Sequence, residues 1–435
     1  MYSKIEDHPE PQAFQSHSHE ASISRRQIAR SNSQLIGVSP KGASVPNVIF
    51  NTFKSFVGSG ILGLPYGFLK GGWALSLISF PITCLIAGYA MVDLIHCKDV
   101  LPRGKADTFP DIGRVAFGPF GYWLVQVSLL AYQIGCCMSY YLFITQNLEI
   151  LVPSMSQQIW VIIFLSVFTM MSFIRSLKTT GILSMMANVC VLGGIVLLLI
   201  GVLLTGKKPQ PIIPFSWSSF PVFFGIVLFA FEGIGLVIPI HNSMEKKKYY
   251  VPALVTTLAF VCILYSGFGF TCYLFLGAGT PEMITAAIAP QYSWIRITTQ
   301  ALLIFAITIS YHLLAHPVYE AFDELPCIRK SNTSQTRHWL WSTLIRFCLI
   351  AVSAIPSVTP LRKHFPDLIG IVGGTFGAAL AFIIPGLLHL KICWRECGVL
   401  RKILDILLLS FAIPASIVVT IFTVISLINN IKKAH

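Results

Sequence analysis

The chain has 435 residues, of which 54% are hydrophobic and only 11% are charged, and its mean hydropathy is +0.72. A soluble domain carries about 25% charged residues, so this composition excludes an ordinary soluble domain and indicates a polytopic membrane protein. The net charge of +13 does not indicate a nucleic-acid partner, because the basic residues lie in short loops between apolar runs and form no stripe with interleaved aromatic residues.

The first segment, residues 1–45, is polar and rich in Ser, His, Gln and Pro. It lacks hydrophobic periodicity, so we expect a disordered tail on the cytosolic side. No secretory signal peptide is expected, because the first apolar run begins only at Pro46.

Eleven apolar runs follow the tail, and most approach the ~20 residues that a helix needs to cross a bilayer. We therefore expect an all-α protein with eleven transmembrane helices in a lipid bilayer. In chain order the runs are Pro46–Phe68, Trp73–His96, Gly121–Glu149, Gln157–Ile174, Gly181–Thr205, Phe220–Ile240, Val251–Leu276, Ser293–Pro317, Trp339–Ile355, Leu368–Leu390 and Ile403–Ile428.

The basic residues set the expected orientation. With a cytosolic N-terminus, 21 of the 31 Lys and Arg residues fall in cytosolic segments and 7 on the opposite side, in agreement with the positive-inside rule. None of the 11 cysteines lies in a loop placed outside, so no structural disulfide is expected. Cys393 and Cys397 read as free juxtamembrane thiols, since two cysteines alone do not make a zinc site.

Two glycine-broken stretches interrupt apolar runs, one in the first run and one in the sixth. The first contains Gly58-Ser59-Gly60-Ile61 and the second contains Phe231-Glu232-Gly233. A break at membrane depth frees backbone groups that lipid cannot satisfy, so it is tolerated where it lines a cavity. A pair of such breaks, one in each half, indicates the binding site of a secondary transporter.

The positions of the breaks also predict the architecture. If spans 1–5 and spans 6–10 are repeats, each has an odd number of crossings, and the second repeat is inverted relative to the first. This is the 5+5 architecture of the leucine-transporter fold. The expected segments are the tail 1–45, the repeats 46–205 and 206–390, and a linker with the eleventh helix in 391–435.

The chemistry expected at the first break is carboxylate binding. The half-helix after Gly58, Ser59 and Gly60 begins with free N–H groups and a positive dipole end, and Ser59 adds a hydroxyl donor. The alternative is ordinary glycine packing between membrane helices. Glu232 carries a coupling proton, pairs with Lys54, or caps the N-terminus of a half-helix.

Tyr140 in the third run and Tyr311 in the eighth either line the cavity or fill packing space between helices. Nucleophile elbows and Walker loops are absent from the sequence, so we expect no enzymatic activity, no cofactor and no metal site. No motif indicates an obligate protein partner.

These residues resemble a known family. The stretches Asn51–Tyr66, Phe229–Gly235, His316–Glu320 and Phe365–Gly370 are similar to spans 1, 6, 8 and 10 of the amino acid/auxin permease superfamily, and within it to the vacuolar amino acid transporter branch, which is related to proton-coupled amino acid transporters. The resemblance covers roughly residues 44–430.

The resemblance implies an alternating-access transporter of amino acids, here of neutral ones, with the substrate held by the backbone at Gly58 to Ile61 and near Phe231 and Gly233. It implies symport with protons, or with sodium in some members, and a vacuolar, lysosomal or plasma membrane. Asn51 stands where proton-coupled animal relatives have a histidine, which leaves sodium coupling or exchange open. A nutrient sensor built on the transporter fold is the alternative from a different class.

Overall fold

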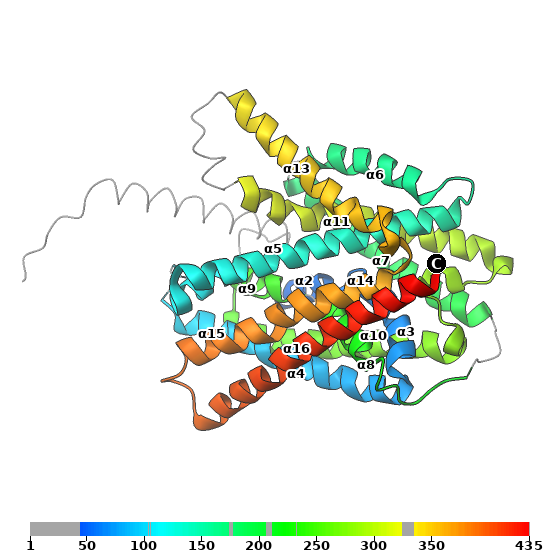
Figure 1. Cartoon of the computed structure of the whole chain (residues 1–435). Coiled ribbons are helices and arrows are strands. Elements are labelled where there is room, and N and C mark those ends of the chain that lie inside the picture. The colour runs from blue at the N-terminus through cyan, green and yellow to red at the C-terminus, as the bar shows by residue number, and fades with distance from the viewer. Residues whose placement is uncertain are drawn as a thin grey trace, which may run out of the picture.

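The structure is a computed structural model that describes residues 44–102, 104, 106–173, 177–205, 211–231, 233–323 and 335–434. In this part of the chain the regular elements are helices, packed side by side in one elongated bundle (Figure 1). The expectation of an all-α protein is therefore confirmed. The tail 1–45, apart from its last two residues, and Glu232 lie outside the described residues.

The helices follow one another in the order expected from the apolar runs. They are α2 (Val45–Phe56), α3 (Gly60–Gly71), α4 (Trp73–Val100), α5 (Phe109–Leu151), α6 (Gln157–Ser172), α7 (Leu177–Thr205), α8 (Phe220–Ala230), α9 (Ile234–Ser243), α10 (Tyr250–Leu276), α11 (Ser293–Asp323), α13 (Gln335–Val358), α14 (Phe365–Val372), α15 (Ile384–Ile392) and α16 (Val399–Ala434).

Within the described residues, nine helical stretches are long and apolar enough to cross a membrane. The remaining two predicted spans correspond to the pair α2 and α3, at 12 residues each, and to the 16-residue α6. The protein is thus multi-pass, and the number eleven stays a prediction.

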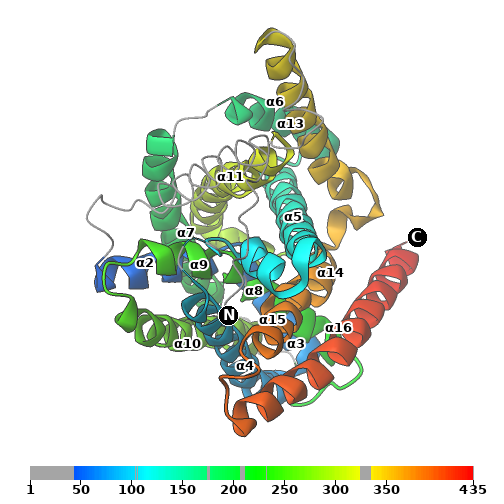
Figure 2. The ribbon, with the colours of Figure 1, turned by 90° about the vertical axis from the view of Figure 1, so that its left-hand side faces the viewer.

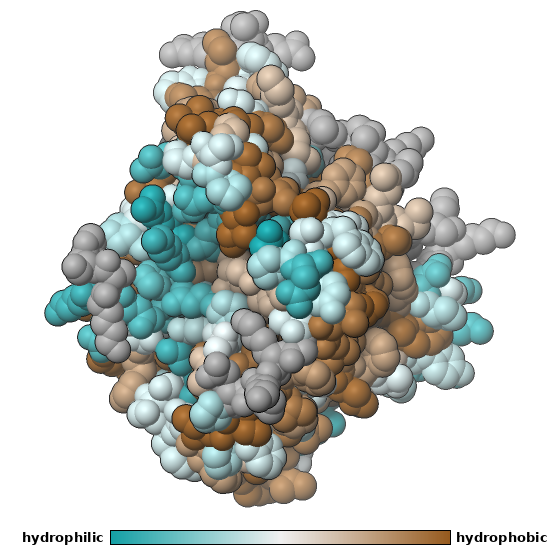
Figure 3. Space-filling view, turned by 90° about the vertical axis from the view of Figure 1, so that its right-hand side faces the viewer, coloured by the Kyte–Doolittle hydropathy of each residue, from teal (hydrophilic) through white to brown (hydrophobic). Residues whose placement is uncertain are grey.

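The outer flanks of the bundle are apolar, as a lipid environment requires. Leu85, Phe120 and Ile263 expose 71–73% of their surface although water would disfavour them there. Figure 3 views the end of the bundle near the end of α16, where hydrophilic residues gather over part of the face and hydrophobic residues border them.

Both expected interruptions are present. The helix α2 ends at Phe56 and α3 begins at Gly60, and α8 ends at Ala230 before α9 begins at Ile234. Several helices extend beyond the expected spans, and two of these differences have a local cause. The eighth span continues through Pro317 to Asp323, because the hydrogen bond that a proline lacks does not by itself end a membrane helix. In the third span, a short helix that begins at Phe109 precedes the predicted run and is joined to it across a kink at Gly118, where φ is +65°.

The tenth predicted span is irregular in its middle. Between α14 and α15 the chain runs through two π-helical turns, Gly373–Gly377 and Ala379–Ile383. Wider π turns often mark functional positions in membrane and soluble helices. Here each π turn contains one residue more than an α-helical turn, so the side chains of α15 are rotated about the helix axis relative to those of a regular continuation of α14.

The half-helix α8 lies near the centre of the bundle, between α3 and α14 (Figure 2). A Cβ on Gly60 would lie 2.7 Å from the Cα of Ala230, so α3 and α8 touch backbone to backbone at the first break. On the other side, a Cβ on Gly225 would lie 2.5 Å from the carbonyl oxygen of Gly370 in α14. Small residues permit this close approach of membrane helices.

This packing predicts that Gly225→Val destabilises the protein. Overpacking of a tight contact costs about 1–3 kcal/mol, so the variant should unfold several degrees below the wild type in a thermal melt of purified protein in detergent. Gly267→Val in α10 is the matched control, because a Cβ there meets no atom within 4 Å. Equal melting temperatures for the two variants would contradict the central position of α8.

Candidate functional site

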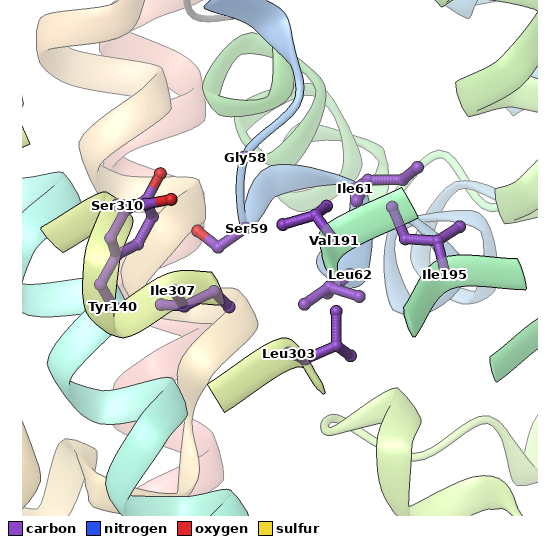
Figure 4. Close-up of a pocket in the computed structure, with 10 residues that line it drawn as sticks. All are labelled: Gly58, Ser59, Ile61, Leu62, Tyr140, Val191, Ile195, Leu303, Ile307 and Ser310. Carbon is purple, nitrogen blue, oxygen red and sulfur yellow. The ribbon is translucent and has the colours of Figure 1, made fainter. Parts of the chain in front are cut away.

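A pocket lies beside the first helix break (Figure 4). Its walls come from the break and α3, from α5 and from the middle of α7 and α11. The residues that line it are Gly58, Ser59, Ile61, Leu62, Tyr140, Val191, Ile195, Leu303, Ile307 and Ser310. None of them is charged, and none is a histidine, cysteine or acid that could ligate a metal.

One side of the pocket is polar. Figure 4 shows the hydroxyl groups of Ser59, Tyr140 and Ser310 gathered together, one from the break, one from α5 and one from α11. Tyr140 lies close to the backbone of the break, since a Cβ on Gly58 would lie 3.0 Å from its hydroxyl oxygen. Ser59 is 1% exposed, and its Oγ has no hydrogen-bond partner among the described residues. A buried hydroxyl without a partner is costly, so this position suits a polar ligand group.

The other side of the pocket is aliphatic. Ile61 and Leu62 from the first turn of α3 face Val191 and Ile195 of α7, with Leu303 of α11 below them. Apolar ligand groups are favoured against such a wall, whereas a charged group would lose its hydration without gaining a partner. The pocket thus has two chemically different ends.

The break itself is held in place by buried tyrosines. The hydroxyl of Tyr265 in α10 donates to the carbonyl oxygen of Phe56, at the end of α2, over 2.5 Å. Beyond the break, the amide of Leu62 donates to the carbonyl of Ser59 over 3.0 Å, which starts α3. The first N–H groups of a helix have no partner within it, and the helix dipole there favours negative charge.

The second break receives similar support but is covered. Tyr132 of α5 donates to the carbonyl oxygen of Phe229, near the end of α8, over 3.1 Å. A Cβ on Gly233 would lie 2.5 Å from the ring of Phe56, so that ring packs against the second break. The ring of Phe231 packs against Phe80, with centroids 5.1 Å apart. Neither Phe231 nor Gly233 lines the pocket.

The site residues predicted from the sequence fall into two groups, those at the pocket and those away from it. Gly58, Ser59, Ile61 and Tyr140 come together in the pocket, and Gly60 lies next to it against Ala230. Asn51 and Lys54 lie on α2, on the other side of the first break. Glu232 is outside the described residues.

Tyr311 does not reach the pocket. Its ring stacks on Phe168 with centroids 3.8 Å apart, and its hydroxyl lies 2.7 Å from that of Ser353. Each residue turns a helix by about 100°, and the face of α11 toward the pocket carries Ile307 and Ser310, three residues apart. Sequence reasoning missed Ser310, and the signal that could have found it is the spacing of small and aliphatic residues along α11.

A second polar cluster lies in the loops near the end of α3. Nδ1 of His364 lies 3.3 Å from a carboxylate oxygen of Glu282 and 3.9 Å from one of Asp367. Burial and the nearby Asp367 carboxylate raise the pKa of Glu282 to about 7, and Lys70 acts in the opposite direction. Burial lowers the pKa of His364.

Among the residues that the structure describes, the clusters of His, Cys and Asp side chains that could hold a metal ion lie away from the pocket, near the ends of α4 and α15.

The sequence matches a family described as "Transmembrane amino acid transporter protein" over residues 41–429. Amino acid transporter AVT3A of Arabidopsis thaliana is 28% identical over 397 residues, which cover 87% of this chain and 88% of the relative. Vacuolar amino acid transporter 3 of Saccharomyces cerevisiae is 26% identical, and the match covers 87% of this chain and 56% of the relative.

Two further similarities extend the comparison. The Drosophila melanogaster protein described as "Proton-coupled amino acid transporter-like protein pathetic" is 25% identical, with 79% of this chain and 76% of the relative covered. Among solved structures, a Na+-coupled sialic acid symporter in its substrate-bound outward-open state aligns with a TM-score of 0.48 and 11% identity, covering 93% of this chain and 97% of the other.

The cluster around Glu282 predicts a pH-dependent stability. Below about pH 4.5 the carboxyl group is protonated in both the folded and the unfolded state. As the pH rises toward 7, the unfolded state loses the proton while the folded state keeps it, so folding weakens. Thermal melts of purified protein should therefore show Glu282→Gln close to wild type near about pH 4 and more stable near about pH 8.

Glu149→Gln serves as the control for this comparison, because Glu149 lies near the end of α5 and outside the cluster. It removes a carboxylate without touching the cluster, so it should not reproduce the gain in stability of Glu282→Gln near about pH 8. A Glu282→Gln variant that is less stable than wild type at the higher pH would show that the ionised carboxylate stabilises the fold.

Proposed function

This chain belongs to the family of transmembrane amino acid transporter proteins, and we propose that it is a secondary active transporter of neutral amino acids, coupled to protons. The vacuolar amino acid transporters among its relatives support an amino acid as the substrate. The relative named as proton-coupled supports the choice of ion.

The observation that carries the substrate class is the division of the pocket into two ends. The carboxylate of an amino acid binds the hydroxyl groups of Ser59 and Tyr140 and the N–H groups at the start of α3. Its side chain lies against the aliphatic wall of Val191 and Ile195. Since none of the described residues that line the pocket is charged, acidic and basic side chains are rejected by the cost of desolvation.

Alternating access follows from the same elements. We assign residues 46–205 and 206–390 to two inverted five-helix repeats, residues 391–435 to the linker and the eleventh helix, and residues 1–45 to a cytosolic tail. The pocket draws Ser59 and Tyr140 from the first repeat and Ser310 from the second. Rocking of one repeat against the other opens the pocket first to one side of the membrane and then to the other.

Coupling rests on Glu232, next to the second break. A carboxylate at membrane depth is expensive and is retained where it has a function, such as carrying a proton. Lys54 and Asn51 lie on α2, before the first break. We assign them to gating, in response to the protonation of Glu232. We assign the protein to the vacuolar or lysosomal membrane, with the plasma membrane as the other location; the names of two fungal relatives, which are vacuolar amino acid transporters, support the vacuole.

The pocket predicts a measurable loss of affinity when one hydroxyl group is removed. Loss of one hydrogen bond to a charged group costs about 1.5–3 kcal/mol, which corresponds to an approximately 12- to 150-fold rise in KM. We expect this rise for Ser59→Ala and for Tyr140→Phe, measured as uptake of labelled leucine into proteoliposomes.

Ser128→Ala provides the control, because Ser128 faces outward on α5 and its hydroxyl donates to the backbone carbonyl of Leu124. Its uptake should equal that of the wild type. Normal KM values in both pocket variants would remove this pocket as the substrate site while leaving the family assignment intact.

Coupling is tested by imposing a pH gradient across the same proteoliposomes. Uptake by the wild type should rise with the gradient, and Glu232→Gln should abolish this rise while it keeps exchange of internal for external amino acid. Uptake that responds to sodium instead, or that ignores both gradients, would replace proton coupling by sodium coupling or exchange. Binding of amino acids without any flux would support the sensor alternative.

A further inference from the structure

A cluster of nitrogen and sulfur ligands lies away from the pocket, where α4 and α15 end. It consists of His96 of α4, His389 of α15, and Cys393 and Cys397, which follow α15. One side-chain atom from each lies within 4.8 Å of all the others. Nδ1 of His96 is 3.1 Å from Nε2 of His389, and Sγ of Cys397 is 3.5 Å from the same nitrogen.

The local backbone explains how three of these groups come to face one way. The amide of Cys393 donates to the carbonyl of His389, and the amide of Cys397 donates to the carbonyl of Cys393, each over 2.9 Å. The chain thus makes helical turns from 389 to 397, and residues four apart lie on one face. His96 completes the set from α4, a helix far away in the sequence.

Two of the six distances between these atoms are close to the edges of a tetrahedron around one metal ion, and the other four are within 4.8 Å. With zinc–nitrogen bonds of about 2.0–2.1 Å and zinc–sulfur bonds of about 2.3 Å, the nitrogen–nitrogen edge is about 3.3–3.4 Å and the nitrogen–sulfur edge about 3.6 Å. The two distances on His389 are within a few tenths of an ångström of these values. Two thiolates and two imidazoles are a donor set that zinc favours.

The other ring nitrogen of His389 contacts a carboxylate, as is common for histidines that bind zinc. Its Nδ1 lies 2.6 Å from a carboxylate oxygen of Asp405, whose other oxygen accepts a hydrogen bond from Tyr89 over 2.7 Å. A proton held on Nδ1 by a carboxylate leaves the lone pair of Nε2 free for a metal. Nε2 is the atom that faces His96 and Cys397.

We propose that His96, His389, Cys393 and Cys397 bind one zinc ion, and that this ion joins α4 to α15 and to the linker before α16. His389 and Cys393 are buried, whereas His96 and Cys397 are partly exposed, so the ion has a path from solvent. On the orientation proposed above this end faces the cytosol, where thiols stay reduced and can act as ligands. The alternative without metal is a hydrogen-bonded network of His96, His389 and Asp405, in which Cys397 and the Asp93 carboxylate are further neighbours of Nε2 of His389.

The experiment uses the full chain, purified in detergent, freed of metal by a chelator and kept reduced because Cys97 is a hydrogen-bond neighbour of Cys393 and could form a disulfide with it. Cobalt is the probe, because tetrahedral Co²⁺ absorbs visible light and its bond to a thiolate adds a charge-transfer band. We expect both bands to saturate at one equivalent of Co²⁺ and to disappear on addition of Zn²⁺.

The variants identify the ligands. Cys397→Ser should lose part of the charge-transfer band, and His96→Ala should lose the tetrahedral spectrum, whereas Cys348→Ser should keep both bands because Cys348 is an exposed cysteine of α13 outside the cluster. Asp405→Asn should keep the spectrum but bind Zn²⁺ about 10- to 100-fold more weakly in competition with a chromogenic chelator. Each variant is first shown to elute from size exclusion as the wild type does.

Two results would overturn the site. The first is reduced, folded wild-type protein that gives no thiolate–cobalt band, which leaves the metal-free hydrogen-bonded network as the explanation. The second is a band that Cys397→Ser and His96→Ala leave unchanged, which places the bound metal elsewhere. Neither result bears on uptake of amino acids, so the transport proposal stands or falls separately.

Discussion

A backbone carbonyl or amide group inside a bilayer must find a partner within the protein, and this constraint governs the centre of the molecule. Both helix breaks free such groups, and the same side-chain type supplies the partner at each. Tyr265 donates to the end of α2, and Tyr132 donates to the end of α8. The two tyrosines come from α10 and α5, so the breaks can exist only while these helices pack beside them. The geometry of the pocket depends on this support.

Glycine provides the second part of the arrangement. The half-helix α8 has a neighbour in direct backbone contact on each side, α3 at Gly60 and α14 at Gly225. Such contacts hold the two breaks close together, because α3 and α8 both begin or end at a break. The ring of Phe56 packs over Gly233, and of the described residues at the two breaks, those of the first line the pocket.

Much of the fold could be predicted from the sequence, because long apolar runs and paired Gly-rich interruptions have few explanations in a membrane. The pocket residues at the first break, Gly58, Ser59 and Ile61, follow from the same local signal. Residues on other helices do not, because their facing depends on helix rotation, as Tyr311 and Ser310 illustrate. The grouping of His96 with Cys397 depends on tertiary contact between distant helices, so the cysteine spacing alone could not indicate it.

The two π-helical turns between α14 and α15 carry a consequence for the history of the chain. A π turn closes one residue later than an α turn, so it accommodates an inserted residue without displacing the helix on either side. A single-residue insertion or deletion within Ala379–Ile383 can therefore be absorbed while Asp367 at one end of the span and His389 at the other keep their neighbours. The first π turn tolerates such changes less well, because Gly373 packs directly on the carbonyl of Gly225 in α8 and Gly374 packs on Val419 of α16.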